Sequence, residues 1–301
     1  PSEADLAETS RLLLSQPWER PLLIDGLAYG AFPTGMAAGL AGRVVALCHH
    51  PLGLETGLSP ERAAQLMRLE RAALGYAAAV IVTSRSTKDL LVADFGVPTD
   101  NIAVAEPGVE PASRAAETPH GQPLRLLAVG SLSPRKGYET MIEALGALKG
   151  LSWNLTIIGG GDEPYAASLR SLVAAKGLQG RVLFRGAILQ SEIDAEYRAS
   201  DIFVMASHFE GYGMVLTEAL ARGLPIVTTL SGSGAANLPD TAAQKVPTGD
   251  AGALAGALAY LIGDASARQR HADAAWEAAS RLPRWDQTAN IVADVLRSVK
   301  P

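Results

Sequence analysis

The stretch from residue 202 to residue 229 constrains the fold of this 301-residue chain more than any other. It opens on an apolar run at 202–206 and closes on a second at 226–229, each typical of a buried parallel strand. Between them, residues 213–222 carry apolar side chains at helical spacing, and Gly223 followed by Pro225 ends that helix. The order strand, loop, helix, strand predicts a parallel sheet covered by helices.

The same alternation runs through most of the sequence and predicts a doubly wound α/β fold. Further strands are expected at 22–25, 43–48, 79–83, 126–129, 155–158 and 182–184. Helices are expected at 4–15, 60–77, 138–148, 165–175, 192–199, 251–262 and 265–281, and another, capped by Ser86, ends near Phe95.

Residues 111–123 are polar and contain proline, with no apolar period, so they are interpreted as an interdomain linker. The linker divides the chain into a first domain at 1–110 and a second at 111–284. A last helix is expected within 285–301, after Pro283.

The composition excludes several classes of protein. Hydrophobic residues make up 48% of the chain and charged residues 19%, which is typical of a globular protein. The net charge of −5 argues against a nucleic-acid partner, and no run is long enough to span a membrane, so at most peripheral membrane contact is expected. The single cysteine, Cys48, cannot form an internal disulfide, which favours a reducing, cytoplasmic compartment.

Glu210 and Glu218 are the strongest candidates for a ligand site. Ligands of such folds lie at the carboxyl ends of strands, where Gly211 and Gly213 let backbone amides approach a phosphate. A carboxylate beside a phosphate suits the binding of sugar hydroxyls, so a nucleotide-sugar satisfies all of these groups together. The alternative is that both glutamates are ordinary solvated surface residues.

The sequence resembles the GT-B fold retaining glycosyltransferases of the family 4 type. The resemblance rests on Glu210-Gly211-Tyr212-Gly213, on Glu218-Ala219 and on residues 223–227, which together match the family's E-x7-E signature. It implies two Rossmann-like domains facing across a cleft, with helix 285–301 packing back on the first. It also implies metal-independent transfer of a hexose from a nucleotide-sugar to an acceptor hydroxyl with retained configuration, without a cofactor. In this scheme Glu210 holds the transferred sugar and Glu218 the ribose, while Tyr212 stands where the family more often has Phe.

A second loop, residues 130–137, supplies candidate cations. The resemblance assigns the diphosphate to Lys136 and Arg135, next to Gly130 and Ser131; the family usually has Arg where this chain has Ser131. Gly160, in a run of three glycines, either lets the backbone approach the ligand or makes a turn. Gly186 and Ile188 resemble the stretch that reads the nucleobase, and a strand end is an equally good interpretation.

The first domain contributes a histidine pair, His49 and His50, at the end of strand 43–48. The resemblance places one of them, with a slight preference for His50, against the donor sugar; a surface or capping histidine is the alternative. Glu55 is expected to be a solvated loop residue, and Glu70 a helix-face residue. No metal-ligand spacing is present.

Two other functions remain as alternatives. A protein of this fold could bind nucleotide-sugars without transferring them. An NAD-dependent oxidoreductase is less favoured because the G-x-G-x-x-G fingerprint is absent. Residues 1–21 also offer no opening strand with a glycine-rich loop, which predicts a truncated first domain that lacks an N-terminal segment of roughly 50 residues.

Overall fold

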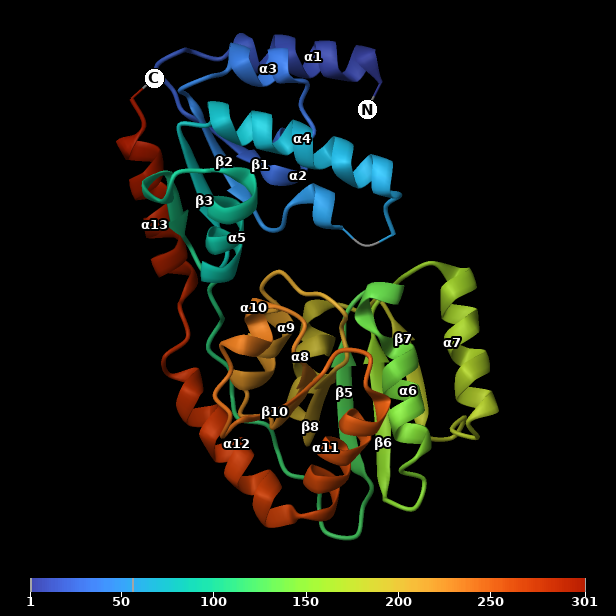
Figure 1. The fold of residues 1–301 in the computed structure, drawn as a ribbon. Coiled ribbons are helices and arrows are strands. Elements are labelled where there is room, and N and C mark those ends of the chain that lie inside the picture. Colours follow the sequence, from blue (N-terminus) through green and yellow to red (C-terminus); the bar gives the residue numbers. More distant parts are fainter. Residues whose placement is uncertain (1, 56, 301) are drawn as a thin grey trace. The chain divides into compact units, whose positions relative to one another are not determined.

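The computed structural model describes residues 2–55 and 57–300, and the chain forms two compact units (Figure 1). Unit 1 comprises Pro1–Gly108 together with Pro283–Pro301, and unit 2 comprises Val109–Leu282. The sequence had placed these divisions after residues 110 and 284.

Unit 1 is built on a four-stranded, wholly parallel sheet in the order β1-β2-β3-β4. Its strands are β1 (Leu22–Asp25), β2 (Val44–Cys48), β3 (Ala79–Val82) and β4 (Ile102–Val104). Its helices are α1 (Glu3–Leu14), α2 (Gly26–Tyr29), α3 (Thr34–Gly39), α4 (Pro60–Tyr76), α5 (Arg85–Phe95) and α13 (Trp285–Ser298), with 3-10 turns η1 (Leu52–Leu54) and η2 (Thr99–Asn101). The sequence had not predicted β4, α2 or α3, which are too short to show a period.

The alternation of side chains along β2 explains why both faces of this sheet are covered. Val44 and Ala46 pack with α2, α3, α4 and α5 on one face. Val45 lies on the other face, against the apolar side of α13. The Thr288 hydroxyl of α13 donates to the carbonyl of Glu106 at 2.7 Å. Helix α13 therefore packs on the sheet of unit 1, although all of unit 2 separates it from β4 in the sequence.

The start of α5 differs from the prediction. Ser84, not Ser86, is the N-cap residue, and its hydroxyl accepts the amide of Thr87 at 3.1 Å. The helix therefore begins at Arg85, and at its other end Gly96 has the positive φ of a left-handed cap.

Unit 2 is built on a six-stranded parallel sheet in the order β10-β9-β8-β5-β6-β7. Its strands are β5 (Leu124–Val129), β6 (Trp153–Ile158), β7 (Val182–Gly186), β8 (Ile202–Met205), β9 (Ile226–Thr229) and β10 (Ala243–Val246). Its helices are η3 (Pro134–Lys136), α6 (Tyr138–Gly146), α7 (Glu163–Ala175), α8 (Gln190–Arg198), α9 (Met214–Leu220), α10 (Ser233–Ala236), α11 (Ala251–Gly263) and α12 (Ala265–Ala279). The predicted doubly wound α/β class is confirmed.

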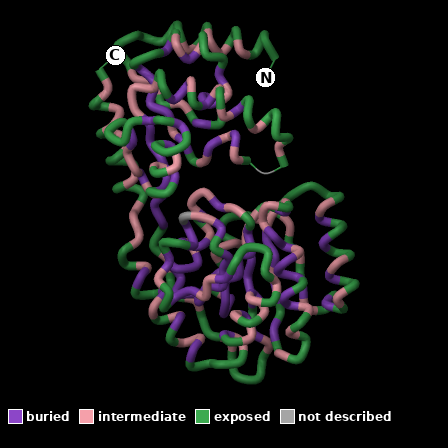
Figure 2. Tube along the Cα trace, in the orientation of Figure 1, coloured by how far each residue is buried: buried purple, intermediate pink, exposed green. Residues whose placement is uncertain are grey.

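This strand order fixes where a ligand can bind. The chain moves from β5 outward to β6 and β7, then returns to β8 on the other side of β5 and continues to β9 and β10. Helices α6, α7 and α11 cover one face, and α8, α9 and α12 cover the other, so the inner strands β8 and β9 are buried on both sides (Figure 2). The helices that follow β5 and β8 lie on opposite faces of the sheet, and open α/β sheets bind ligands at such a reversal.

The predicted linker lies along unit 2 as an extended segment. The amides of Ala115 and Ala116 donate to the carbonyls of Arg222 and Arg198. The buried carboxylate of Asp201 accepts both the amide and the hydroxyl of Thr118. These hydrogen bonds make the segment part of unit 2.

Arg43, at the start of β2, is fully buried. Its guanidinium donates to the carbonyls of Gln16, Pro17 and Arg20 at 3.4, 2.9 and 3.1 Å and lies over the ring of Trp18. The planar guanidinium of Arg43 thus holds the chain segment between α1 and β1 against the sheet.

Arg43→Lys should destabilise unit 1 by about 2–4 kcal/mol, because an ammonium cannot reach three carbonyls that match a guanidinium fork. Urea unfolding of the full chain, followed by hydrogen exchange of the β2 amides, measures this loss. Arg68→Lys, on the exposed side of α4, is the matched control. An equal stability for both variants would contradict this role of Arg43.

Candidate active site

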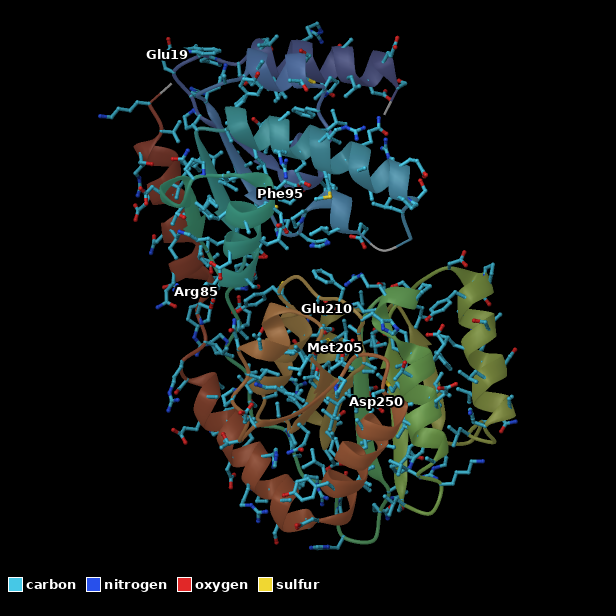
Figure 3. The ribbon with its side chains drawn as sticks, in the orientation of Figure 1. Glu19, Arg85, Phe95, Met205, Glu210 and Asp250 are labelled. Atoms are coloured by element: carbon cyan, nitrogen blue, oxygen red, sulfur yellow. The ribbon has the colours of Figure 1, made fainter. Side chains whose placement is uncertain are left out.

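A buried ion pair joins the two loops at the reversal of the unit 2 sheet. Lys136 ends η3, which follows β5, and Glu210 follows β8 beyond Met205 (Figure 3). The ammonium nitrogen of Lys136 lies 2.5 Å from Oε1 of Glu210, and the side chains are 12% and 9% exposed. The interpretation of Glu210 as a solvated surface residue is therefore wrong.

Glu210 is held from several directions. The same oxygen accepts the hydroxyl of Ser207 at 2.7 Å, and Arg135 lies 3.4 Å away. The Ser207 carbonyl in turn accepts the hydroxyl of Thr229 at 2.6 Å, which ties this loop to β9. A carboxylate this deeply buried needs such donors, because removing a charge from water without partners costs several kcal/mol.

Glycines allow the loops around Glu210 to pack in direct contact. Gly137, with φ of 63°, has no room for a Cβ atom because the carbonyl of Ala206 lies against it. Gly232 and Gly234 are limited in the same way by the carbonyls of Glu210 and Tyr212. The Glu210 amide donates to the Ser231 carbonyl at 2.6 Å. The loop 230–234 therefore lies directly beside Glu210.

The three-glycine run after β6 serves loop packing. A Cβ atom on Gly159 would meet the carbonyl of Gly130, and one on Gly161 would meet Leu132. Gly160 has no such limit, since the nearest atom to its Cβ position is 3.6 Å away on Ala187. Of the two interpretations offered, the turn that lets the loops after β5 and β6 approach each other accounts for Gly159 and Gly161.

Arg135 lies on the Glu210 side of this region. Its guanidinium donates to the Phe209 carbonyl at 2.8 Å. Ser131 is exposed in the loop after β5, and Gly186, with φ of 67°, ends β7 at the same edge of the sheet; Ile188 packs partly buried against the core. Arg135 therefore supplies a cation in the region where the family's usual arginine is replaced by Ser131.

Glu218 is the centre of a second network, on α9. It accepts the hydroxyl of Tyr197 at 2.9 Å. Arg222 lies over the Tyr197 ring, donates to the Glu218 carbonyl and pairs with Asp194 at 2.5 Å. Burial raises the pKa of Glu218, while the hydrogen bond from Tyr197 and the charge of Arg222 act in the opposite direction.

The histidine pair of unit 1 follows β2. Nε2 of His49 lies 3.3 Å from Oδ2 of Asp25, at the end of the neighbouring strand β1, and both side chains are about half exposed. Nε2 of His50 is buried. Burial raises the pKa of the preceding Cys48 thiol to about 12, so this cysteine is held as a neutral thiol.

Glu70 lies on a helix, α4, as expected from the sequence, and its side of the helix is buried. It is 1% exposed, and its carboxylate accepts the amide of Leu52 at 2.8 Å and that of Gly53. It thereby fixes η1, which begins just after the histidine pair. Burial raises the pKa of Glu70 to about 7, although these amides act in the opposite direction.

The sequence did not single out Ser207, Tyr197 or Arg222. Ser207 follows the end of β8 after one residue, so its position at a carboxyl strand end was a usable signal. Tyr197 lies 21 residues before Glu218, and no local pattern marks it. Arg222 follows Glu218 by four residues, so its helical spacing from Glu218 was also a usable signal. Within residues 2–55 and 57–300, no group of three or more His, Cys, Asp or Glu side chains could hold a metal ion, and no helix is long and apolar enough to cross a membrane.

Family comparisons divide the chain much as the structure does. The family described as "Glycosyl transferases group 1" matches residues 109–277. The family described as "Glycosyltransferase Family 4" matches residues 6–113.

Curated relatives match most of the chain at moderate identity. The chain is 30% identical over 287 residues to the GDP-mannose-dependent alpha-(1-6)-phosphatidylinositol monomannoside mannosyltransferase of Mycobacterium tuberculosis, covering 88% of this chain and 72% of the relative. It is 32% identical over 171 residues to the mannosylfructose-phosphate synthase of Agrobacterium fabrum, covering 51% of this chain and 38% of that relative.

Solved structures share the fold. HepE of Anabaena in complex with UDP has a TM-score of 0.78 at 20% identity, covering 99% of this chain and 84% of that one. Sucrose-phosphate synthase of Thermosynechococcus elongatus has a TM-score of 0.73 at 25% identity, covering 84% of this chain and 67% of that one.

The raised pKa of Glu70 predicts a pH-dependent stability. Its pKa moves from an ordinary 4.5 in the unfolded chain to about 7 in the fold, so folding favours the protonated form. This contribution to stability is present below pH 4.5 and is lost as the pH rises through about 7. The loss amounts to about 3 kcal/mol.

Glu70→Gln removes this titration. The difference in the free energy of unfolding, wild type minus variant, should fall by about 3 kcal/mol between about pH 5 and pH 8. Urea unfolding at several pH values measures the difference, with Glu19→Gln, an exposed site in unit 1 (Figure 3), as the control. If this difference in unfolding free energy does not change over this pH range, the pKa of Glu70 is not raised by folding.

Proposed function

Because the chain belongs to the family 4 glycosyltransferases, with a second unit of the group 1 type, we propose that it transfers a sugar from a nucleotide-sugar to an acceptor hydroxyl. The fold is GT-B, with two doubly wound parallel units and glycosyltransferases as structural neighbours. The donor binds at the reversal of the unit 2 sheet, between the loops after β5 and β8. A UDP complex of HepE, a protein of the same fold, supports a nucleotide diphosphate as the leaving group.

The Lys136–Glu210 pair carries this proposal. A carboxylate and a diphosphate repel each other, yet a sugar site beside a leaving diphosphate needs both. Lys136 resolves the conflict, because its ammonium has three donors and only one is needed for Glu210. The others face the diphosphate oxygens, while Oε2 of Glu210 accepts a hydroxyl of the transferred sugar.

Cations of the chain neutralise the leaving group in this scheme. Negative charge on the diphosphate grows toward the transition state, where Lys136 and Arg135 stabilise it most. We propose transfer with retained configuration and no essential metal, in which the leaving phosphate accepts the proton of the acceptor hydroxyl. Unchanged activity after treatment with EDTA is the expected result.

The remaining positions bind parts of the donor and line the site. Glu218 accepts hydrogen bonds from the ribose hydroxyls, and the backbone of Gly186 and Ile188 contacts the base. The backbone of Gly130 and Ser131 lies along the diphosphate. In unit 1, a histidine of the His49–His50 pair contacts the donor sugar.

Glu218→Ala should weaken nucleotide binding without a matching loss of turnover, because ribose contacts are present in the ground and transition states alike. Charged hydrogen bonds of this kind contribute about 1.5–3 kcal/mol, which corresponds to a dissociation constant about 10- to 150-fold higher. Isothermal titration with UDP, GDP and ADP measures the effect. Glu143→Ala, on the exposed side of α6, is the control, and an unchanged dissociation constant would remove Glu218 from the site.

Lys136→Ala should instead lower turnover by about 10²- to 10³-fold, since it removes charge stabilisation that is strongest in the transition state. Release of UDP, GDP or ADP from the corresponding sugar nucleotides measures turnover, with product configuration read by NMR. Lys149→Ala is the exposed control in the same unit. Normal turnover in the Lys136 variant would show that this cation does not act on the diphosphate.

The wild-type protein also separates the alternatives. A thermal-shift panel of UDP-, GDP- and ADP-sugars with NAD identifies which ligand stabilises the fold by mass action. A sugar-nucleotide that binds without transfer or hydrolysis would favour a binding protein, and stabilisation by NAD alone would refute the proposal.

A further inference from the structure

We propose that Tyr197 is a positioning residue for the nucleotide, because its buried hydroxyl holds the Glu218 carboxylate in the orientation that receives the ribose. This inference rests on the proposed function, in which Glu218 is the ribose acceptor. Tyr197 itself touches no ligand in this scheme.

The hydroxyl of Tyr197 acts as a hydrogen-bond donor. Tyr197 is fully buried, and its hydroxyl lies 2.9 Å from Oε2 of Glu218 and 3.3 Å from the carbonyl of Val215. Both partners are acceptors. Burial and the charge of Glu218 raise the pKa of this phenol well above its ordinary value, so it remains protonated.

This geometry gives the two oxygens of the Glu218 carboxylate different roles. One oxygen, Oε2, is occupied by a buried donor that cannot rotate away, since the Tyr197 ring is stacked on Phe203 at 5.7 Å and covered by Arg222 at 4.7 Å. The other oxygen, Oε1, is the one left to receive the ribose hydroxyls. A ligand then meets an acceptor that is already oriented, which reduces the cost of ordering it on binding.

The same hydrogen bond favours the ionised form of Glu218. Burial favours the protonated form of Glu218, and the donated hydrogen bond opposes it. A protonated Glu218 would lose acceptor capacity, so nucleotide binding should weaken as the pH falls through its pKa. Without the Tyr197 hydroxyl, nucleotide binding should begin to weaken at a higher pH.

Few other charges act on Glu218. Arg222 favours its ionised form, and Asp194 of α8 favours its protonated form. Helix α10 and strands β8 and β9 also pack against α9, and none of them carries a charged residue. On α12, Asp273 pairs with Arg114, Glu277 pairs with Arg281, and Arg268 donates to the carbonyls of Leu261 and Ile262.

Tyr197→Phe removes only the hydroxyl and keeps the stacked ring. Titration of UDP, GDP and ADP into the full chain should show about tenfold weaker binding of whichever nucleotide the wild type binds, equivalent to about 1.4 kcal/mol. The pH at which binding is half lost should also move upward relative to the wild type.

Tyr165→Phe is a matched control, because Tyr165 donates in the same way to a carboxylate, that of Glu139, at 2.7 Å on another pair of helices of unit 2. It should change neither the affinity nor the pH profile. The nucleotide's own phosphate ionisation affects all variants equally, so only the difference from the wild type reports on Glu218.

A double-mutant cycle tests whether Tyr197 acts through Glu218. In a Glu218→Ala background, Tyr197→Phe should cause no further loss of affinity. An undiminished loss in that background, or an unmoved pH profile, would assign Tyr197 a merely structural role and overturn the inference. Wild-type affinity in Tyr197→Phe would overturn it too, whereas a wild type that binds none of the three nucleotides would contradict the proposed function instead.

Discussion

The buried contact between Lys136 and Glu210 is the interaction on which the arrangement of unit 2 depends. It connects the loops after β5 and β8, the two neighbouring strands from which the chain departs in opposite directions. The helices that follow these two strands, α6 and α9, lie on opposite faces of the sheet, and open α/β sheets bind ligands at such a reversal. Lys136 and Glu210 are therefore paired with each other at the edge of the sheet where a ligand is expected.

Buried or half-buried carboxylates recur in this protein, and each is held by a different kind of donor. Glu210 is held by an ammonium and a hydroxyl, Glu218 by a phenol, and Glu70 by backbone amides. The difference has chemical consequences. The ammonium brings a full opposite charge, whereas the phenol and the amides orient a carboxyl group whose burial still raises its pKa. The pKa values of Glu218 and Glu70 are therefore both raised by burial, although different groups donate to the two carboxylates.

Much of the fold was predictable because the relevant signals are local. Apolar runs of strand length, and helices ended by residues such as Gly96 and Gly223, follow from backbone preferences within a few residues. The errors arose where elements are short or where neighbours decide. Strand β4 and helices α2 and α3 are too short for a period to appear, and the α5 cap was misplaced because Ser84 and Ser86 are equally good capping residues by type.

The sequence by itself determined the doubly wound class, the strand ends that carry Lys136 and Glu210, and the family resemblance, since all of these follow from the order of residues along one chain. Only the tertiary structure decided which side chains meet. Tyr197 lies 21 residues before Glu218, and their hydrogen bond exists because α8 and α9 pack on the same face of the sheet. Glu70 was expected on a helix face, and it is buried because the loop after β2 folds over α4 and presents its amides there. Burial and pairing are properties of packed neighbours, and spacing along the sequence does not contain them.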